Sequence, residues 1–430
     1  MSHPNSRPLD DIRVIDLTQA LSGPLCTAHL AVLGAEVIKI ERPDTGDVAR
    51  HNPPFAGRRG VTPDAALPDD ISTCALKRNR DKKSVAIDLS TPDGLDLLKR
   101  LVAKADVVVE NFRPGVAAAL GIDHASLMRI RPGLVCCSIS GFGSSGPYRQ
   151  WSAMDTLVQA MAGVMAVTGA AGGPPTKTGL NVADIMPALF ASTAILAALR
   201  QRDRTGLGES IEVAMFDCLV SLLWDEPLEY YVERELPSRS GNRFLRFAPW
   251  NTYAARDGYI VLCSGQQAHF AALCKLMGRP QLIEDERFST MARRIEHVDE
   301  IDDQIGRWVA LHDRVDLITK CQAAGVVCGP VNELVDVVND PGIAARGMVK
   351  PLLHPVFGAI ANAGAPEYPV RFGSTPVEFT EAAPALGQHT QAVLEDLLGL
   401  SEVEIDALAE RGVVRRSATA AAVALQGEPG

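Results

Sequence analysis

Short apolar runs alternate with helix-length amphipathic stretches over the first 140 residues of the chain. The segments between the runs begin and end like helices, with Pro92 at one start and Gly34 at one C-terminal cap. Strands that alternate with helices predict a parallel sheet wound by crossover helices. The predicted strands are Ile12–Leu17, Glu36–Glu41, Ser84–Leu89, Asp106–Asn111 and Leu134–Ile139, and the first predicted helices are Pro24–Ala35 and Thr91–Lys104.

The pattern beyond these strands predicts a second domain. Residues Pro43–Arg80 are expected to form a long loop, either mobile or with a binding or oligomer-contact role. Helical patterns from Met154 to Arg202 and a strand at Glu209–Met215 extend the large domain. We expect a doubly wound, Rossmann-like α/β domain over 1–223, a linker over 224–248 and a smaller α+β domain over 249–350. A return linker over 351–384 and a helical segment over 385–430 then rejoin the large domain.

Composition limits the partners and the compartment. The chain is 47% hydrophobic and 22% charged, as in folded globular proteins, and its net charge of -10 disfavours binding to nucleic acid or an anionic membrane. Nine cysteines without a C-x-x-C pair predict free thiols in a reducing compartment. Because no signal-peptide or membrane-span pattern is visible, we expect a cytoplasmic protein.

Several chemical motifs fail on inspection. Gly141–Gly146 fits G-x-G-x-x-G after a predicted strand, but Pro147 follows it and no acidic residue stands about 20 positions on, which excludes the dinucleotide fingerprint. There is no P-loop, no G-x-S-x-G elbow and no His or Cys cluster with metal-ligand spacing. We therefore expect no metal and no ATP-driven activation.

A single acid, Asp184, stands between a turn-rich segment and a long apolar helical pattern. Read locally it is a helix N-cap, since Asp is a favoured cap and Pro187 is tolerated in a first turn. A catalytic role is compatible with that position. A carboxylate at the positive end of a helix dipole stays ionised at neutral pH, and in a dry cleft it can attack a thioester carbonyl.

Other polar residues allow two interpretations each. Asp155 lies at capping-box spacing from Ser152, so it caps its own helix or supports a ligand contact. Five positive charges between Lys77 and Lys83 fit the phosphates of a nucleotide-like ligand or a solvated cluster. Arg42 follows the second strand, where ligands of open α/β sheets bind, and a surface role is equally open.

Taken in order along the chain, a set of segments resembles the family III CoA-transferases, of the formyl-CoA and carnitine CoA-transferase type. These segments are Val14–Leu17, Ser22–Pro24, Leu33–Asp47, Asp106–Gly115, Ser140–Gly143, Gly146–Pro147, Leu157–Ala160, Thr168–Gly169, Arg204–Glu209 and, near the C-terminus, Leu386–Thr390. The resemblance implies a large nucleotide-binding-like domain that holds both termini, a smaller domain, and a homodimer of two interlocked, ring-like chains. Acyl-CoA and a small organic acid are the implied substrates, with no permanently bound cofactor.

The resemblance also assigns residues and a mechanism. Asp184 matches the family's nucleophile, which forms a mixed anhydride with the donor acyl group and then an aspartyl-CoA thioester. Residues at the family's CoA contacts are Leu21, Ser22, Arg42, Leu89, Ser90, Asn111, Phe112 and Arg113. Asp155 joins this cofactor-binding set as a supporting contact.

Three departures from the family bear on the reaction. Met154 stands where the related α-methylacyl-CoA racemases place a His, and a thioether accepts no proton, which disfavours a racemase. Ala119 replaces a basic CoA contact of many relatives, and Pro237–Pro249 holds one glycine, Gly241, where formyl-CoA transferase has a Gly-rich loop. Formate and oxalate are thus disfavoured as substrates. The expected reaction is transfer of CoA from a donor such as succinyl-CoA or acetyl-CoA to an organic acid. A racemase-like isomerase and a catalytically silent CoA-binding subunit of a hetero-oligomer are the alternatives.

Overall fold

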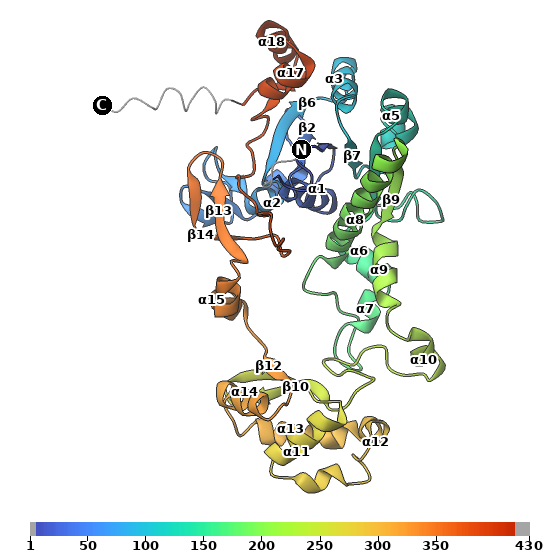
Figure 1. Cartoon of the computed structure of the whole chain (residues 1–430), viewed down its shortest axis with the longest axis vertical. Coiled ribbons are helices and arrows are strands. Elements are labelled where there is room, and N and C mark those ends of the chain that lie inside the picture. Colours follow the sequence, from blue (N-terminus) through green and yellow to red (C-terminus); the bar gives the residue numbers. More distant parts are fainter. Residues whose placement is uncertain (1–5, 418–430) are drawn as a thin grey trace, which may run out of the picture. The chain divides into compact units, whose positions relative to one another are not determined.

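The structure of the chain is a computed structural model that describes residues 6–417 (Figure 1). These residues form two compact units. The first unit comprises residues 6–162, 179–225 and 344–417, and the second comprises residues 163–178 and 226–343. The expected small domain at 249–350 is thus joined by residues 163–178 and by residues 226–248 of the expected linker, while its residues 344–350 belong to the first unit. The end of the expected helical segment at 385–430 lies outside the described residues from 418 on.

A seven-stranded sheet forms the centre of the first unit, in the order β15-β6-β2-β1-β7-β8-β9. Six strands are parallel, and β15 pairs antiparallel with β6. The order reverses between β1 and β7, which is where doubly wound sheets bind ligands. The strands are β1 (Arg13–Asp16), β2 (Glu36–Glu41), β6 (Lys82–Ile87), β7 (Val107–Glu110), β8 (Val135–Ser140), β9 (Ser210–Ala214) and β15 (Val414–Arg415).

Neighbouring residues of each strand enter different cores, as the two-residue period of a strand requires. Val14 and Val37 pack on one face with helices α1 (Ser22–Val32) and α8 (Val182–Thr205). Ile15 and Ile38 pack on the other face. The helices of that second face are α3 (Pro92–Val102), α5 (His124–Ile130), α17 (Thr390–Leu398) and α18 (Glu402–Glu410). Because both faces are covered, the strands read as continuous apolar runs, and the expected α/β class is confirmed.

Helix α8 is an apolar helix of 24 residues, contrary to the expectation that no segment has the pattern of a membrane span. By length and composition alone it could cross a membrane. In the fold it packs against α1, α6 (Asp155–Met161), α9 (Met215–Leu223) and the strands β8 and β9. Ala188, Ala191 and Ile195 of this helix belong to the core of the domain, while Leu189 and Phe190 are exposed.

The segment expected as a loop at Pro43–Arg80 is folded. It contains the short helices η1 (Val48–His51) and α2 (Thr73–Arg78) and a small antiparallel sheet of β3 (Phe55–Gly57), β4 (Gly60–Thr62) and β5 (Ile71–Ser72). The expected return linker holds a hairpin, β13 (Val349–His354) and β14 (Gly358–Pro366). Ala56, Leu76, Leu352 and Ile360 from these two regions share a small apolar core, which the polar composition of either segment alone did not reveal.

The second unit has its own apolar core around Phe270 and Phe288. Its sheet consists of a hairpin, β10 (Trp250–Ala255) and β11 (Gly258–Cys263), with β12 (Cys328–Pro330) antiparallel beside β11. Its helices are α7 (Val164–Val167), α10 (Leu228–Glu233), α11 (Gln267–Leu276), η2 (Pro280–Ile283), α12 (Met291–Glu296), α13 (Val298–Val309), α14 (Arg314–Ala323) and α15 (Leu334–Asn339). The remaining helices of the chain are α4 (Val116–Ala119) in the first unit and α16 (Pro341–Ala345) at the boundary.

Candidate active site

A cavity of about 260 Å³ lies at the carboxyl ends of the central strands. Residues that follow β1, β2, β6 and β7 line it, so it occupies the edge at which parallel sheets bind ligands. Four of the residues expected to contact CoA are among the lining. The lining residues are Leu17, Gln19, Ile40, Glu41, Arg42, Ile87, Asp88, Leu89, Ser90, Phe112 and Leu120.

Asp184 lies near this edge, in the first turn of α8. It is the third residue of the helix, and the N-cap position belongs to Asn181, so the expectation that Asp184 is the N-cap is wrong. Pro187 accordingly lies beyond the first turn. The Asp184 side chain is half-buried, and its Oδ1 lies 3.4 Å from the hydroxyl of Ser22, the first residue of α1. Two helix starts therefore meet at the carboxylate.

The pKa of Asp184 is raised to about 6. Burial is the largest cause, and the negative charge of Asp155 adds to it, while the positive charge of Arg78 and the hydrogen bond from Ser22 act in the opposite direction. The carboxylate is still mainly ionised at pH 7. Asp184 is therefore an accessible anion whose basicity exceeds that of an ordinary aspartate.

Asp155 fixes the start of α8. Its Oδ1 accepts a hydrogen bond from the backbone N–H of Ala183 at 2.8 Å, and its Oδ2 accepts one from the Gln159 side chain at 2.7 Å. Gln159 also donates to the carbonyl of Leu180 at 3.3 Å. Asp155 itself is the first residue of α6 and does not cap that helix. The expected capping box from Ser152 is therefore wrong, because the carboxylate caps the neighbouring helix.

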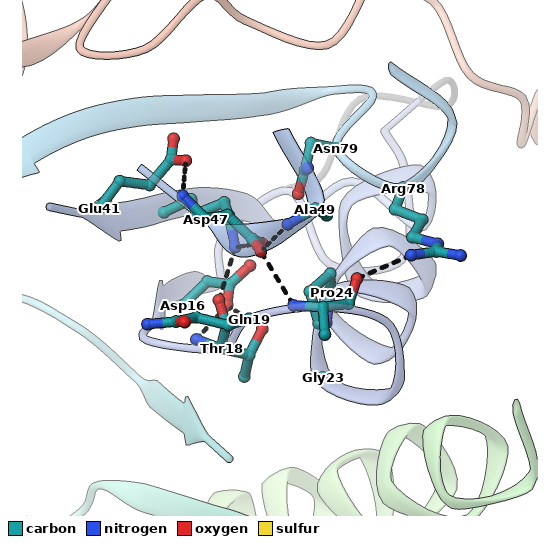
Figure 2. A network of polar contacts seen from close by, with 12 residues as sticks. Asp16, Thr18, Gln19, Gly23, Pro24, Glu41, Asp47, Ala49, Arg78 and Asn79 are labelled. Atoms are coloured by element: carbon teal, nitrogen blue, oxygen red, sulfur yellow. Dashed lines mark hydrogen bonds and ion pairs between the residues drawn. The ribbon is translucent and has the colours of Figure 1, made fainter. Parts of the chain in front are cut away.

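The loop between β1 and α1 is held from two directions. Ala20 has a φ of 67°, which is strained for a residue with a Cβ. The Asp47 carboxylate accepts the N–H of Ala20 at 2.9 Å, and Arg78 donates to the carbonyl of Ala20 at 3.0 Å (Figure 2). Gly23 follows in the same turn, where an added Cβ would come 2.3 Å from the Cβ of Thr18. These contacts determine where Ser22, and hence its hydroxyl, lies beside Asp184.

A buried ionic network supports this loop from below. Lys39 pairs with Asp47 at 2.9 Å and Lys82 pairs with Asp16 at 3.1 Å, and all four side chains are excluded from solvent. Burial would raise the pKa of Asp16, but Lys39 and Lys82 outweigh it and lower the pKa to about 2. Glu41 closes the network by accepting the N–H of Asp47 at 3.0 Å. The network holds β1, β2 and β6 to the loop that carries the site.

The residues expected to contact CoA occupy different positions along this edge. Arg42 is exposed and pairs with Asp44 at 3.1 Å, and Leu89, Ser90 and Phe112 line the cavity with it. Asn111 is half-buried and holds the loop instead, accepting the N–H of Gln19 and donating to its carbonyl. The three others lie outside the cavity lining: Leu21 and Ser22 are buried at the start of α1, and Arg113 is exposed.

The basic run from Lys77 to Lys83 is neither a phosphate site nor a solvated cluster as a whole. Lys82 is buried in the network, and Lys83 pairs with Glu36 at 2.6 Å. The guanidinium of Arg80 lies 3.7 Å from the Phe379 ring centroid. Lys77 is the one exposed residue among these five, and Arg78 reaches the loop beside Asp184. Most of these charges are therefore structural, which the sequence pattern did not indicate.

Three arginines of the segment 239–246 form contacts within the second unit. Arg239 donates to the carbonyls of Ala166 and Gly173. Arg243 pairs with Asp299 and Asp302, and Arg246 pairs with Glu226. These contacts give all three a structural role in this unit. Gln266 occupies the N-cap position of α11 without a side-chain cap hydrogen bond.

The Gly141–Gly146 motif lacks the helix that a dinucleotide fingerprint requires. No helix opens at Gly146, since the next helix, α6, begins at Asp155. Over residues 6–417, no group of three or more His, Cys, Asp or Glu side chains is placed to hold a metal ion. All nine cysteines are free.

Three functional positions were missed from the sequence. Gln159 stands four residues after Asp155 on one face of a helix, a spacing that could have identified it. Asp47 and Arg78 gave no such signal, because their partner Ala20 lies far away in the sequence. Only the fold brings them to the loop.

Comparison with known proteins agrees with the geometry. The sequence profile described as CoA-transferase family III matches residues 9–390. The chain is 35% identical over 397 residues to the succinate–glutarate CoA-transferase of Agrobacterium fabrum, covering 92% of this chain and 97% of the relative. It is 36% identical over 413 residues to the succinyl-CoA–D-citramalate CoA-transferase of Chloroflexus aurantiacus, covering 95% of this chain and 98% of the relative. The crystal structure of a CaiB/BaiF family protein from Brucella suis superposes with a TM-score of 0.78 at 34% identity, covering 91% of this chain and all of that one.

Proposed function

The chain belongs to the CoA-transferase family III, and from this premise we propose that it moves CoA from an acyl-CoA donor to an organic acid through Asp184. The observation that carries the proposal is the half-buried Asp184 carboxylate, with its pKa raised to about 6, at the start of α8 and 3.4 Å from the Ser22 hydroxyl. A more basic carboxylate that is still ionised at pH 7 is a better nucleophile toward a thioester. The enzyme class follows from the family, and the chemistry at Asp184 is our proposal.

The reaction needs no net proton transfer. An oxygen of Asp184 attacks the carbonyl carbon of the donor thioester, and the C–S bond breaks. CoA leaves as a thiolate, and the acyl group stays on Asp184 as a mixed anhydride. The thiolate attacks the aspartyl carbonyl, and the donor acid leaves as carboxylate, which produces an aspartyl-CoA thioester. The acceptor carboxylate attacks this thioester, CoA leaves again, and CoA finally takes the new acyl group and frees Asp184. Because one thioester replaces another, no ATP is consumed.

The neighbouring residues have roles that fit these steps. The Ser22 hydroxyl donates toward Asp184 and can steady the carboxylate in line for attack. Asp155 and Gln159 fix the first turn of α8, and we class them as positioning residues. Arg42, Leu89, Ser90 and Phe112 are placed to receive the nucleotide part of CoA at the cavity, and Leu21, Asn111 and Arg113 are proposed contacts along the same edge.

The names of the relatives guide the choice of substrates. Several are succinyl-CoA-dependent and are named for glutarate, D-citramalate or mesaconate. We propose succinyl-CoA as donor and a dicarboxylate as acceptor, with acetyl-CoA as the second donor to test. A relative from Acetobacter aceti, 36% identical over 343 residues, is named acetyl-CoA:oxalate CoA-transferase, so oxalate belongs among the acceptors tested.

A donor-by-acceptor screen, scored by mass spectrometry of new CoA thioesters, tests the activity. The intermediate is tested by incubating the protein with donor and then with hydroxylamine, which should convert Asp184 to a hydroxamate. Absence of exchange together with an unmodified Asp184 would favour a silent CoA-binding subunit. Deuterium incorporation at the α-carbon of an acyl-CoA without any acceptor acid would favour a racemase-like isomerase.

We also propose a homodimer, interlocked as the family resemblance implies, that works in the cytoplasm without a permanently bound cofactor. The exposed apolar side chains Leu189, Phe190 and Leu196 on α8 support an interface on that helix. The nine free thiols support a reducing compartment. Sedimentation equilibrium tests the homodimer, and fractionation of the native host tests the cytoplasmic location.

A further inference from the structure

The proposed reaction brings negative charges together at one place. Asp184 and Asp155 are both acids, and the charge of Asp155 already raises the pKa of Asp184. The acceptor carboxylate must reach the carbonyl carbon of the Asp184 thioester beside the negative charge of Asp155, and like charges in a half-buried site repel strongly. A cation beside Asp184 that holds the incoming carboxylate would remove this obstacle.

Arg78 is the cation that the fold brings to this place. It is the last residue of α2, and its Nη1 donates to the carbonyl of Ala20 at 3.0 Å. Ala20 is two residues before Ser22, whose hydroxyl lies 3.4 Å from Asp184. Figure 2 shows the Arg78 guanidinium directed at this loop, with Asp47 bound to the same turn. One edge of the guanidinium is therefore fixed while the side chain stays partly exposed.

The rest of the guanidinium is available. Of the contacts described for Arg78, the bond to Ala20 is the single hydrogen bond, and neither Asp184 nor another acid lies within the 4.0 Å of an ion pair. Its positive charge nevertheless acts on Asp184, so the two groups are near neighbours without being in contact. A planar guanidinium with free N–H groups recognises a carboxylate in bidentate fashion.

Four other cations around the site are already engaged. Lys39 and Lys82 are buried in the ionic network, and Arg50 pairs with Glu41 at 2.7 Å. Arg42 pairs with Asp44. Of these five cations, Arg78 is the one that combines free donors with proximity to Asp184.

Building on the proposed function, we propose that Arg78 binds the reacting carboxylate of the acid substrate through its free guanidinium N–H groups and holds it beside Asp184. The donor acid leaves by the reverse of the path by which the acceptor attacks, so Arg78 serves both acids. Because it binds the carboxylate that reacts, it does so equally for mono- and dicarboxylic acids. Arg78 is thus a substrate-binding residue of the acid site and is separate from the CoA contacts.

The test compares Arg78→Gln and Arg78→Lys with Lys77→Gln, which removes the neighbouring exposed charge on the same helix. Kinetics are measured at pH 8, where Asp184 is ionised. In Arg78→Gln, the KM of the acceptor and the inhibition constant of the released acid should both rise by about tenfold or more, for mono- and dicarboxylates alike. The two constants of Arg78→Lys should lie between those of the wild type and those of Arg78→Gln, and the constants of Lys77→Gln should match those of the wild type. The Kd of CoA, measured by calorimetry, should not change.

Other outcomes overturn the proposal. Unchanged acid constants in Arg78→Gln would exclude it, and so would an equal loss of CoA affinity, which would mean that Arg78 merely holds the loop. An effect limited to dicarboxylates would assign Arg78 to the second carboxylate. Calorimetric titration of acid into the protein with CoA separates this inference from the proposed function. Suppose that the wild type shows no CoA exchange but binds the acid, and that Arg78→Gln does not bind it. The transferase proposal then fails and the Arg78 assignment stands.

Discussion

Asp155 accepts the backbone N–H of Ala183 at 2.8 Å, so a carboxylate at the start of one helix caps the start of the next. The cap holds the first turn of α8, which carries Asp184, and it also places a second negative charge beside that residue. One side chain thus determines both the geometry and the basicity of the proposed nucleophile.

The pH dependence of exchange should report on this pair. With the pKa of Asp184 at about 6, the rate should fall about tenfold per pH unit below pH 6 as the carboxylate becomes protonated. Asp155→Asn keeps an oxygen for Ala183 but removes the charge, so the acidic limb should move to lower pH. Measurement of kcat/KM against pH checks this. A limb that does not move in this variant would exclude Asp155 as a cause of the raised pKa.

Asp184→Asn should reduce exchange by at least about a thousandfold, since a carboxamide forms no anhydride. This variant should raise the free energy of unfolding at pH 7, whereas the loss of an N-cap would lower it. The folded-state pKa is raised from 3.8 to about 6, so ionisation opposes folding at pH 7. After allowance for solvent screening, the variant should gain about 1 kcal/mol in free energy of unfolding at pH 7, and no gain should be seen below pH 4. Urea denaturation at both pH values checks this, and a loss of stability at pH 7 would contradict it.

The buried network allows a comparison of two aspartates that are three residues apart. Asp47→Asn leaves Lys39 with a weakened partner out of solvent, and it should lower the free energy of unfolding by about 3 kcal/mol. Asp44→Asn removes a partner from the exposed pair with Arg42 and should change stability by less than about 1 kcal/mol. Chemical denaturation of both variants checks the contrast. Equal effects would mean that the loop does not depend on the buried charge.

Arg42 should contribute to CoA binding through the phosphates. Arg42→Gln is expected to raise the KM of the acyl-CoA by about tenfold with little change in kcat, because Arg42 lines the cavity but lies apart from Asp184. Added salt should weaken CoA binding by the wild type more than by the variant. Steady-state kinetics at two ionic strengths measure this. A fall in kcat without a rise in KM would place Arg42 in the acid chemistry instead.

The features that were predicted correctly from the sequence are those that depend on a local pattern of residues. The six parallel strands follow from apolar runs such as Val107–Glu110, and Asp184 was found because a lone acid before a long apolar helix stands out. These features depend on residues that are neighbours in the chain.

The errors concern contacts between distant residues. Asp184 was assigned the cap because it precedes the apolar pattern, but the α8 cap comes from Asp155, 29 residues earlier. The charges from Lys77 to Lys83 resembled a phosphate site, although Lys82 is buried against Asp16. A charge run does not show which of its members the fold will enclose, because that depends on strand order.

Strand β15 places the far end of the described chain in the central sheet. Val414 pairs with Ile87 on β6, and the N–H of Asp88 reaches the carbonyl of Val413 at 2.8 Å, directly before the cavity residues Leu89 and Ser90. During synthesis, β6 leaves the ribosome more than 300 residues ahead of its partner, and it stays an open sheet edge in the meantime. Pulse proteolysis of stalled nascent chains should therefore find the large unit unprotected until Arg415 has emerged.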